Sequence, residues 1–178
     1  MNPLTSSTSV VAVYASHVQA ESAVKALQVA GFDMKQLSIV GRDHHLDEHV
    51  VGYYNVGDRM KLWAKSGAFW GGLWGMMFGS AFFWIPTVGP LLVAGPLVGW
   101  LVSVLEGAAV VGGLSAIGAA LYSTGIPKDS VLKYETALKT GSFVLVARGT
   151  VEDAEHAREI LASTAASTLD HHQFAPQA

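Results

Sequence analysis

The densest group of chemically active side chains is the heptapeptide DHHLDEH, which begins at residue 43. If this stretch is helical, His45 and His49 share one face at i, i+4 spacing, which suits imidazole ligation of a divalent metal. The stretch lacks the His-Glu-x-x-His pattern of a metalloprotease helix. Only the fold could bring His171 and His172 beside it. We therefore predict no metal site, with His44, His45 and His49 as weak candidates, and a solvated polar loop or pH-sensing histidines as the alternatives.

No other residue pattern indicates an enzymatic site. The 178 residues include no cysteine, which excludes disulfides and thiolate metal ligands. Gly52 and Gly57 have the spacing of a phosphate-binding loop but lack the Lys-Ser/Thr that completes one. The net charge of −3, without a clustered basic face, argues against nucleic-acid binding. We predict a non-enzymatic protein with no cofactor, no nucleic-acid partner and no small-molecule substrate.

A long apolar block occupies the middle of the chain. Residues 66 to 127 carry one formal charge, Glu106, although 14% of the whole chain is charged. An apolar run of about 18 residues can cross a bilayer as a helix, and this block is long enough to cross twice. A charge near the middle of a span costs about 3 kcal/mol. We therefore predict that Glu106 is an intramembrane acid at an oligomer contact or an interfacial position, with an ion or proton path as the alternative.

Prolines and tryptophans divide the block into two predicted helices. The prolines between residues 85 and 96 predict a turn, which leaves helices over 64–84 and 97–123 as a hairpin. Trp63 and Trp84 lie one hydrocarbon thickness apart if the first helix is continuous, roughly 32 Å at 1.5 Å per residue. This spacing predicts interfacial anchors at the two membrane surfaces. Basic residues flank the block on both sides and predict that both termini are cytoplasmic.

Glycines in the block repeat at every fourth position. Such a stripe lets another helix backbone approach closely, as in packed membrane helices. Each glycine destabilises an isolated helix by about 1 kcal/mol relative to alanine, so close packing has to offset several such losses. We predict that the hairpins self-associate through two stripes, formed by Gly67, Gly71, Gly75 and Gly79 and by Gly95 and Gly99.

The chain on either side of the block has the patterns of a mixed sheet and helix domain. The predicted strands are 9–15, 36–41, 142–148 and 167–173, and the predicted helices are 17–30, 128–140 and 150–165. This order predicts an α+β fold, a split β-α-β (ferredoxin-like) sheet interrupted by the long apolar glycine-rich hairpin. The predicted divisions are a flexible N-terminus (1–8), a discontinuous α+β domain (9–60 and 124–173), the hairpin insertion (61–123) and a tail (174–178).

Several segments together resemble the bacterial general stress protein 17M-like family. They are AESAVKALQVAGF, LSIVGRD, the glycine-rich block, GIPKDSVLKYETALKTGSFVLVARG and AEHAREIL. The likeness extends over about residues 9–172, and its most specific part is 125–149. The resemblance implies a small, stress-linked, non-enzymatic protein that associates with a membrane. It supplies no catalytic residues for this chain.

Two hypotheses of function follow. In the first, a helical hairpin anchors a stress-associated protein to the cytoplasmic membrane, and its Gly-x-x-x-Gly faces drive homo-oligomer formation. In the second, the protein is a soluble high-order homo-oligomer, a shell, ring or tube, with the hairpins buried in a shared apolar core in the cytoplasm. A small channel or transporter subunit that uses Glu106 is a third, less favoured reading.

Overall fold

The computed structural model describes residues 8–42, 80–85, 88–107 and 114–173. Six strands in this part of the chain form one sheet. They are β1 (Thr8–Tyr14), β2 (Leu37–Arg42), β3 (Ser80–Ile85), β4 (Gly89–Ala94), β5 (Phe143–Gly149) and β6 (Thr168–Gln173). The helices are α1 (His17–Val29), α3 (Leu97–Gly107), α4 (Ala116–Ser123), α5 (Lys128–Lys139), α6 (Val151–Ala162) and a 3-10 turn η1 (Met34–Gln36).

Local sequence signals set the ends of the helices outside the apolar block. The Ser16 hydroxyl caps α1 by accepting from the backbone N–H of Gln19. Just beyond the C-terminus of α1, Gly31 has a φ of 80°, a conformation that glycine adopts without strain. Thr150 and Asp153 form a capping box at the start of α6, in which each side chain accepts from the other's backbone N–H. The helix boundaries predicted for these two segments are confirmed to within a few residues.

The two halves of the chain pair directly in the sheet. The strand order is β3-β4-β2-β5-β1-β6, and every neighbouring pair is antiparallel. β5 lies between β1 and β2, with Val146 opposite Val11 and Leu145 opposite Ile39. The strands predicted at 9–15 and 142–148 are therefore neighbours in one sheet, which joins the two parts of the chain on either side of the apolar block.

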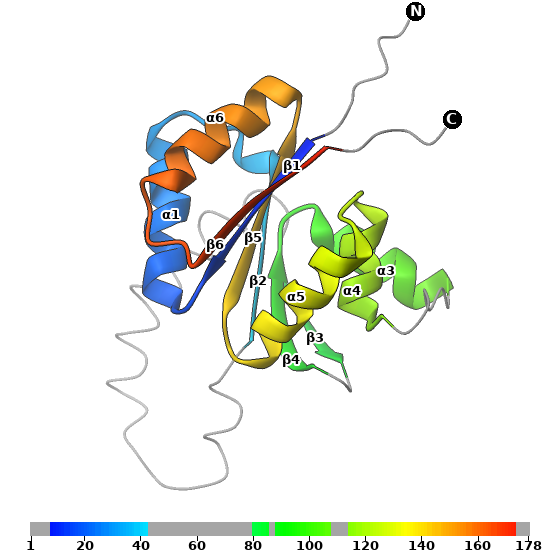
Figure 1. Cartoon of the computed structure of the whole chain (residues 1–178). Helices are drawn as coiled ribbons and strands as arrows, with labels where there is room; N and C mark the ends of the chain where they lie inside the picture. The colour runs from blue at the N-terminus through cyan, green and yellow to red at the C-terminus, as the bar shows by residue number, and fades with distance from the viewer. Residues whose placement is uncertain (1–7, 43–79, 86–87, 108–113, 174–178) are drawn as a thin grey trace, which may run out of the picture.

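Helices cover both faces of the sheet, so that the molecule has three layers (Figure 1). Because side chains alternate between the faces of a strand, each face of the sheet has its own core. One core contains the buried residues of α1 and α6, among them Leu27 and Leu161. The other contains residues of α3, α4 and α5, among them Leu101, Leu121 and Leu138. The chain is thus a mixed α/β protein with an antiparallel sheet at its centre.

The predicted helical hairpin is wrong where the structure describes its centre. Residues 80–85 and 89–94 are strands β3 and β4, and β4 pairs with β2. The run AFFWI is aromatic and β-branched and therefore favours a strand, although periodicity alone allows a helix. The predicted reversal does occur, but it joins two strands. Pro90 is accommodated because the pairing of β4 with β2 begins at Leu91, one residue later.

The second predicted helix, 97–123, is also interrupted. The structure has α3 up to Gly107 and a separate α4 that begins at Ala116, capped by the side chain of Ser115. α3 has 11 residues, about 16 Å of helix, roughly half of a bilayer core. Within the described ranges, no helix has the length and apolar character needed to span a membrane.

Candidate functional site

Many of the residues predicted to have a functional role lie outside the described part of the chain. His44, His45 and His49 are among them, so the metal prediction is untested. The same holds for Trp63 and for the first glycine stripe, formed by Gly67, Gly71, Gly75 and Gly79. In the described ranges, no three His, Asp or Glu side chains are grouped closely enough to hold a metal.

The predicted site residues that do lie in the described ranges have different environments. Gly95 precedes α3 with a φ of 90°, and a Cβ there would lie 2.2 Å from the Leu37 carbonyl oxygen. It is therefore a turn residue pressed against β2 and not part of a helical stripe. Gly99 does lie on α3, where a Cβ would meet no atom within 4 Å. Glu106 belongs to the last turn of α3, and Trp84 belongs to β3 and not to the end of a transmembrane helix.

A polar cluster joins α5 to the edge strand β6. The Tyr134 hydroxyl donates to Asp170 Oδ2 at 2.8 Å and lies 2.7 Å from His172 Nε2. Lys133 Nζ donates to the same Asp170 oxygen at 3.0 Å. Because the one hydroxyl proton is donated to Asp170, the Nε2 atom of His172 must carry the hydrogen of the second bond. The cluster therefore ties a buried tyrosine to two side chains of an edge strand.

The electrostatics of this cluster suit a structural role. Burial, together with the hydrogen bond to Asp170 and its charge, raises the pKa of Tyr134 far above its usual value. Burial lowers the pKa of His172 despite the opposing charge of Asp170. Burial raises the pKa of Asp170, but hydrogen bonds from Lys133 and Tyr134 outweigh it and leave that pKa below the usual value. A tyrosine with a raised pKa stays protonated and donates a hydrogen bond, which makes it a poor nucleophile or base.

A buried carboxylate holds the start of α4. Glu135 on α5 is only 5% exposed, and its Oε1 accepts from the backbone N–H of Ser115 at 2.9 Å. The Ser115 hydroxyl also donates to Oε1. A Cβ at Gly118 would lie 2.1 Å from the same oxygen, so only glycine leaves room for the carboxylate. These contacts position α4 and leave Glu135 no accessible chemistry.

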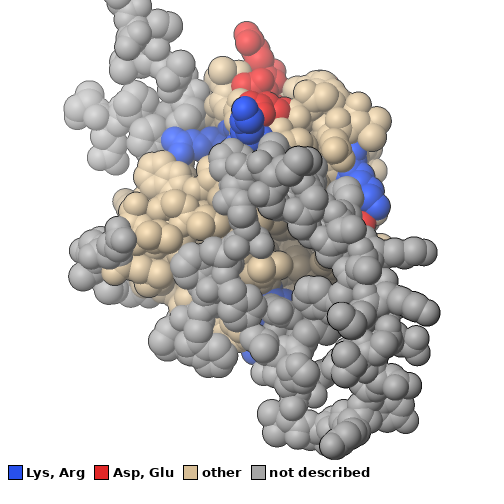
Figure 2. Space-filling view, turned by 180° about the vertical axis from the view of Figure 1, so that it is seen from behind, with Lys and Arg blue, Asp and Glu red and all other residues tan. Residues whose placement is uncertain are grey.

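The outward face of α3 is an exposed apolar surface. Val102 and Leu105 are 37% and 53% exposed, and Gly99 and Ser103 on the same helix are also exposed. In the rear view of Figure 2, charged side chains lie near the top, on the right and at the lower centre, and the part of the left side that is not grey is tan. We call Gly99, Val102, Ser103 and Leu105 the α3 surface. An exposed apolar helix face of this kind is typical of an association site.

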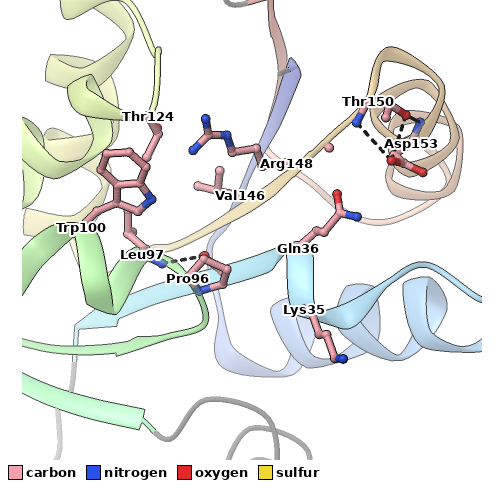
Figure 3. A pocket seen from close by; sticks show the side chains of 12 residues that line it. Lys35, Gln36, Pro96, Leu97, Trp100, Thr124, Val146, Arg148, Thr150 and Asp153 are labelled. Carbon is pink, nitrogen blue, oxygen red and sulfur yellow. Dashed lines mark hydrogen bonds between the residues drawn. The ribbon is translucent and has the colours of Figure 1, made fainter. Parts of the chain in front are cut away.

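A groove of about 380 Å³ lies between the first turn of α3 and the end of β5 (Figure 3). Trp100 and Leu97 form one side of it, and Val146 lies on its floor. The guanidinium carbon of Arg148 lies 5.5 Å from the centroid of the Trp100 ring, a cation–π arrangement. The backbone N–H of Leu97 donates to Ser38 Oγ at 3.1 Å, which fixes the start of α3 against β2.

Sequence reasoning missed both the groove and the polar cluster. Trp100 and Arg148 are 48 positions apart, and neither belongs to a short motif. Tyr134 and His172 are likewise distant in sequence. The one available signal was the polar character of the last strand, TLDHHQ, which contrasts with the apolar strands β1 and β5.

The fold and these surfaces define a mixed α/β protein with a candidate association surface and a candidate binding groove. Residues 9–82 match the family model described as the heat induced stress protein YflT domain. This match covers less than half of the chain and supports a relationship to bacterial general stress proteins. No curated protein and no solved structure matches the chain.

Proposed function

We propose that this chain is a non-enzymatic, stress-associated protein that acts by self-association through the α3 surface. The stress role rests on the match of residues 9–82 to the YflT domain. Self-association rests on one observation, the exposed apolar face of a helix that carries no charge before Glu106. The finer family assignment, to the 17M-like general stress proteins, belongs to the same proposal.

A second copy of this chain is the occupant that the α3 surface fits best. A surface without charge offers no selectivity for a charged partner, but it can be self-complementary about a two-fold axis. Gly99 has open space around its Cβ position, so a neighbouring helix could approach the α3 backbone closely. Leu105 and Val102 would then lose their exposed area to the partner, which supplies the driving force for association.

The test is the mass of the full-length protein in solution, measured by sedimentation velocity over a range of concentrations. Wild type is expected to be larger than a monomer, and Val102→Glu with Leu105→Glu should shift it toward the monomer. The matched control is Val18→Glu with Val29→Glu, which adds the same charge at exposed positions of α1. A monomeric wild type, or an equal shift in the control, would overturn the proposal.

Location at the cytoplasmic membrane, with both termini in the cytoplasm, is the second candidate. The observation that favours it is the same exposed apolar face, because such a helix can also lie in a membrane interface. Peripheral contact is the form we propose, since the centre of the block is built into the sheet. Co-sedimentation of the full chain with phosphatidylglycerol vesicles tests it. Binding that the two α3 glutamates remove and the α1 glutamates leave intact would support membrane contact.

We also propose that β1-α1-β2 and β5-α6-β6 form a split β-α-β arrangement. The support is the order β2-β5-β1-β6 within the sheet, in which each helix connects two strands that have one other strand between them. In this proposal β3, β4, α3 and α4 are additions to that unit. Together with α5, the added helices cover the sheet face that α1 and α6 leave open.

A further inference from the structure

A partly exposed tryptophan forms one wall of the groove beside α3. Trp100 is 38% exposed, and Pro96 and Leu97 line the same side of the groove (Figure 3). The groove volume of about 380 Å³ lies at the lower end of the range of small-molecule sites, roughly 300–1,000 Å³. An indole ring that stays partly exposed in such a groove offers a flat apolar surface to a ligand.

The charged side chains that line the groove are engaged within the protein or point away from the tryptophan. The guanidinium carbon of Arg148 lies 5.5 Å from the centroid of the Trp100 ring, and its charge already has partners in the chain. Asp153 Oδ2 accepts from the backbone N–H of Thr150 at 3.0 Å and from the Thr150 hydroxyl at 2.9 Å. Lys35 is exposed, and Figure 3 shows its side chain pointing away from Trp100. A charged ligand would therefore lose hydration in the groove without meeting an unengaged charge beside the indole.

Three neutral polar side chains along the groove are also bonded within the protein. Ser38 Oγ accepts from the first backbone N–H of α3 at 3.1 Å. The Thr124 hydroxyl donates to the Leu121 carbonyl oxygen at 2.7 Å. Gln36 Nε2 donates to Asp33 Oδ2 at 3.3 Å. Recognition in this groove therefore depends on apolar contact more than on hydrogen bonds.

We propose that this groove binds a small uncharged molecule with a flat aromatic ring. The ring of the ligand would stack on the exposed part of Trp100 and bury apolar area against Leu97 and Pro96. Arg148 lies over the indole, and the hydrogen bond from the Leu97 N–H to Ser38 Oγ fixes the first turn of α3. The indole is thus held in place before any ligand enters, which reduces the entropy that binding would otherwise lose.

The experiment titrates the full-length protein, labelled with ¹⁵N-tryptophan, with quinoline at pH 7.5, where this probe is uncharged. The indole N–H resonance of Trp100, assigned with Trp100→Phe, should move, saturate and show the largest shift among the five tryptophans. Ligand-observed NMR supplies the affinity of variants that lack this resonance. N-methylquinolinium and quinoline-6-carboxylate, ions of similar size, should each bind more weakly by about tenfold or more, because their charge has to be desolvated.

Two matched substitutions locate the binding site. Trp100→Ala should weaken quinoline binding by about tenfold or more, because it removes the stacking surface. Tyr122→Ala removes an exposed ring from the neighbouring helix α4 and should leave the affinity unchanged. If Trp100→Ala proves unstable, the largest resonance shift in the wild type decides the location. Val102→Glu with Leu105→Glu should still bind quinoline, which separates this inference from the proposed self-association.

Any of three results overturns the inference. The Trp100 resonance could fail to saturate up to about 10 mM quinoline, an affinity too weak for a built site. Either ion could bind as tightly as quinoline, which would show that the groove does not select an uncharged ligand. The ring could bind elsewhere, as shown by a larger shift of another tryptophan or by equal affinities of Trp100→Ala and the wild type.

Discussion

Helices α3 and α4 on one face of the sheet present a very different surface to solvent from that of α1 and α6 on the other. α6 contains five charged residues, Glu152, Asp153, Glu155, Arg158 and Glu159, and α1 has an ion pair between Glu21 and Lys25 at 2.9 Å. On the other face, α5 is also charged, but α4 has no charged residue and α3 has only Glu106, in its last turn. Both layers bury comparable leucines against the sheet. They differ mainly on their outward sides.

This difference distinguishes the apolar side chains that the fold needs from those that are available for the proposed association. A helix needs only one apolar stripe to pack on a sheet, and its other side is normally polar. α1 and α6 follow this pattern, with exposed valines such as Val18 and Val29 close to the ends of α1. α3 is apolar on its outward side as well, which packing within one chain does not require. These exposed apolar side chains of α3 are the reason for proposing a partner.

The two variants with the largest expected effect on stability test whether the two cores unfold as one cooperative unit. Leu27→Ala removes a buried side chain from the α1/α6 core, and Leu101→Ala does so from the core under α3. Each should lower the free energy of unfolding by about 2–5 kcal/mol. Because β5 contributes side chains to both cores, we expect a single transition in urea denaturation for both variants. Two transitions, with Leu101→Ala moving only one of them, would show that the layers unfold separately.

Alanine substitutions at two glycines, one in α4 and one in α3, should change the stability of the protein in opposite directions. Gly118→Ala places a Cβ against Glu135 Oε1 and should destabilise the fold by about 1–3 kcal/mol. Gly99→Ala meets open space and should stabilise α3 by up to about 1 kcal/mol through helix propensity. Thermal melting of the two variants against wild type measures both. Equal effects would mean that Gly118 and Gly99 have similar surroundings, contrary to the structure.

A buried tyrosine on each face allows a matched comparison of hydrogen bonds. The Tyr134 hydroxyl is bonded to a carboxylate, and Tyr14 on the other face is 2.8 Å from Thr164 Oγ1. Replacement by phenylalanine should reduce stability by about 1.5–3 kcal/mol at Tyr134 and about 0.5–1.5 kcal/mol at Tyr14. Chemical denaturation at pH 7.5 gives both values. A larger loss for Tyr14→Phe would argue against the charge-assisted bond at Asp170.

The smallest expected effect is a pH dependence confined to the polar cluster. The folded-state pKa of His172 is lowered, so the unfolded chain takes up the proton first and stability falls as the pH drops below about 6.5. The folded-state pKa of Tyr134 is raised, so stability falls as the pH rises above about 10. His172→Gln should flatten the acidic side of a stability profile measured by urea denaturation from pH 5 to 8. An unchanged slope in that variant would assign the acid sensitivity to other groups.

The sequence alone determined the elements whose ends carry local signals. The capping box at Thr150, the glycines after α1 and α5, and the β-branched run of β5 each fix a boundary through nearby residues. Pairing between the halves could also be predicted, because neither half has enough strands to bury a sheet face. These features depend on interactions between residues close in sequence or on the number of strands in each half of the chain.

Tertiary structure decided the apolar block and the sites. AFFWI is compatible with a helix or a strand, and the open edge of β2 selects the strand by offering hydrogen bonds to β4. The Arg148–Trp100 pair and the Tyr134–Asp170–His172 cluster join residues that no spacing rule connects. A uniformly apolar segment carries no periodicity to show which side faces the core. Its secondary structure and its exposed face therefore depend on what the rest of the chain places beside it.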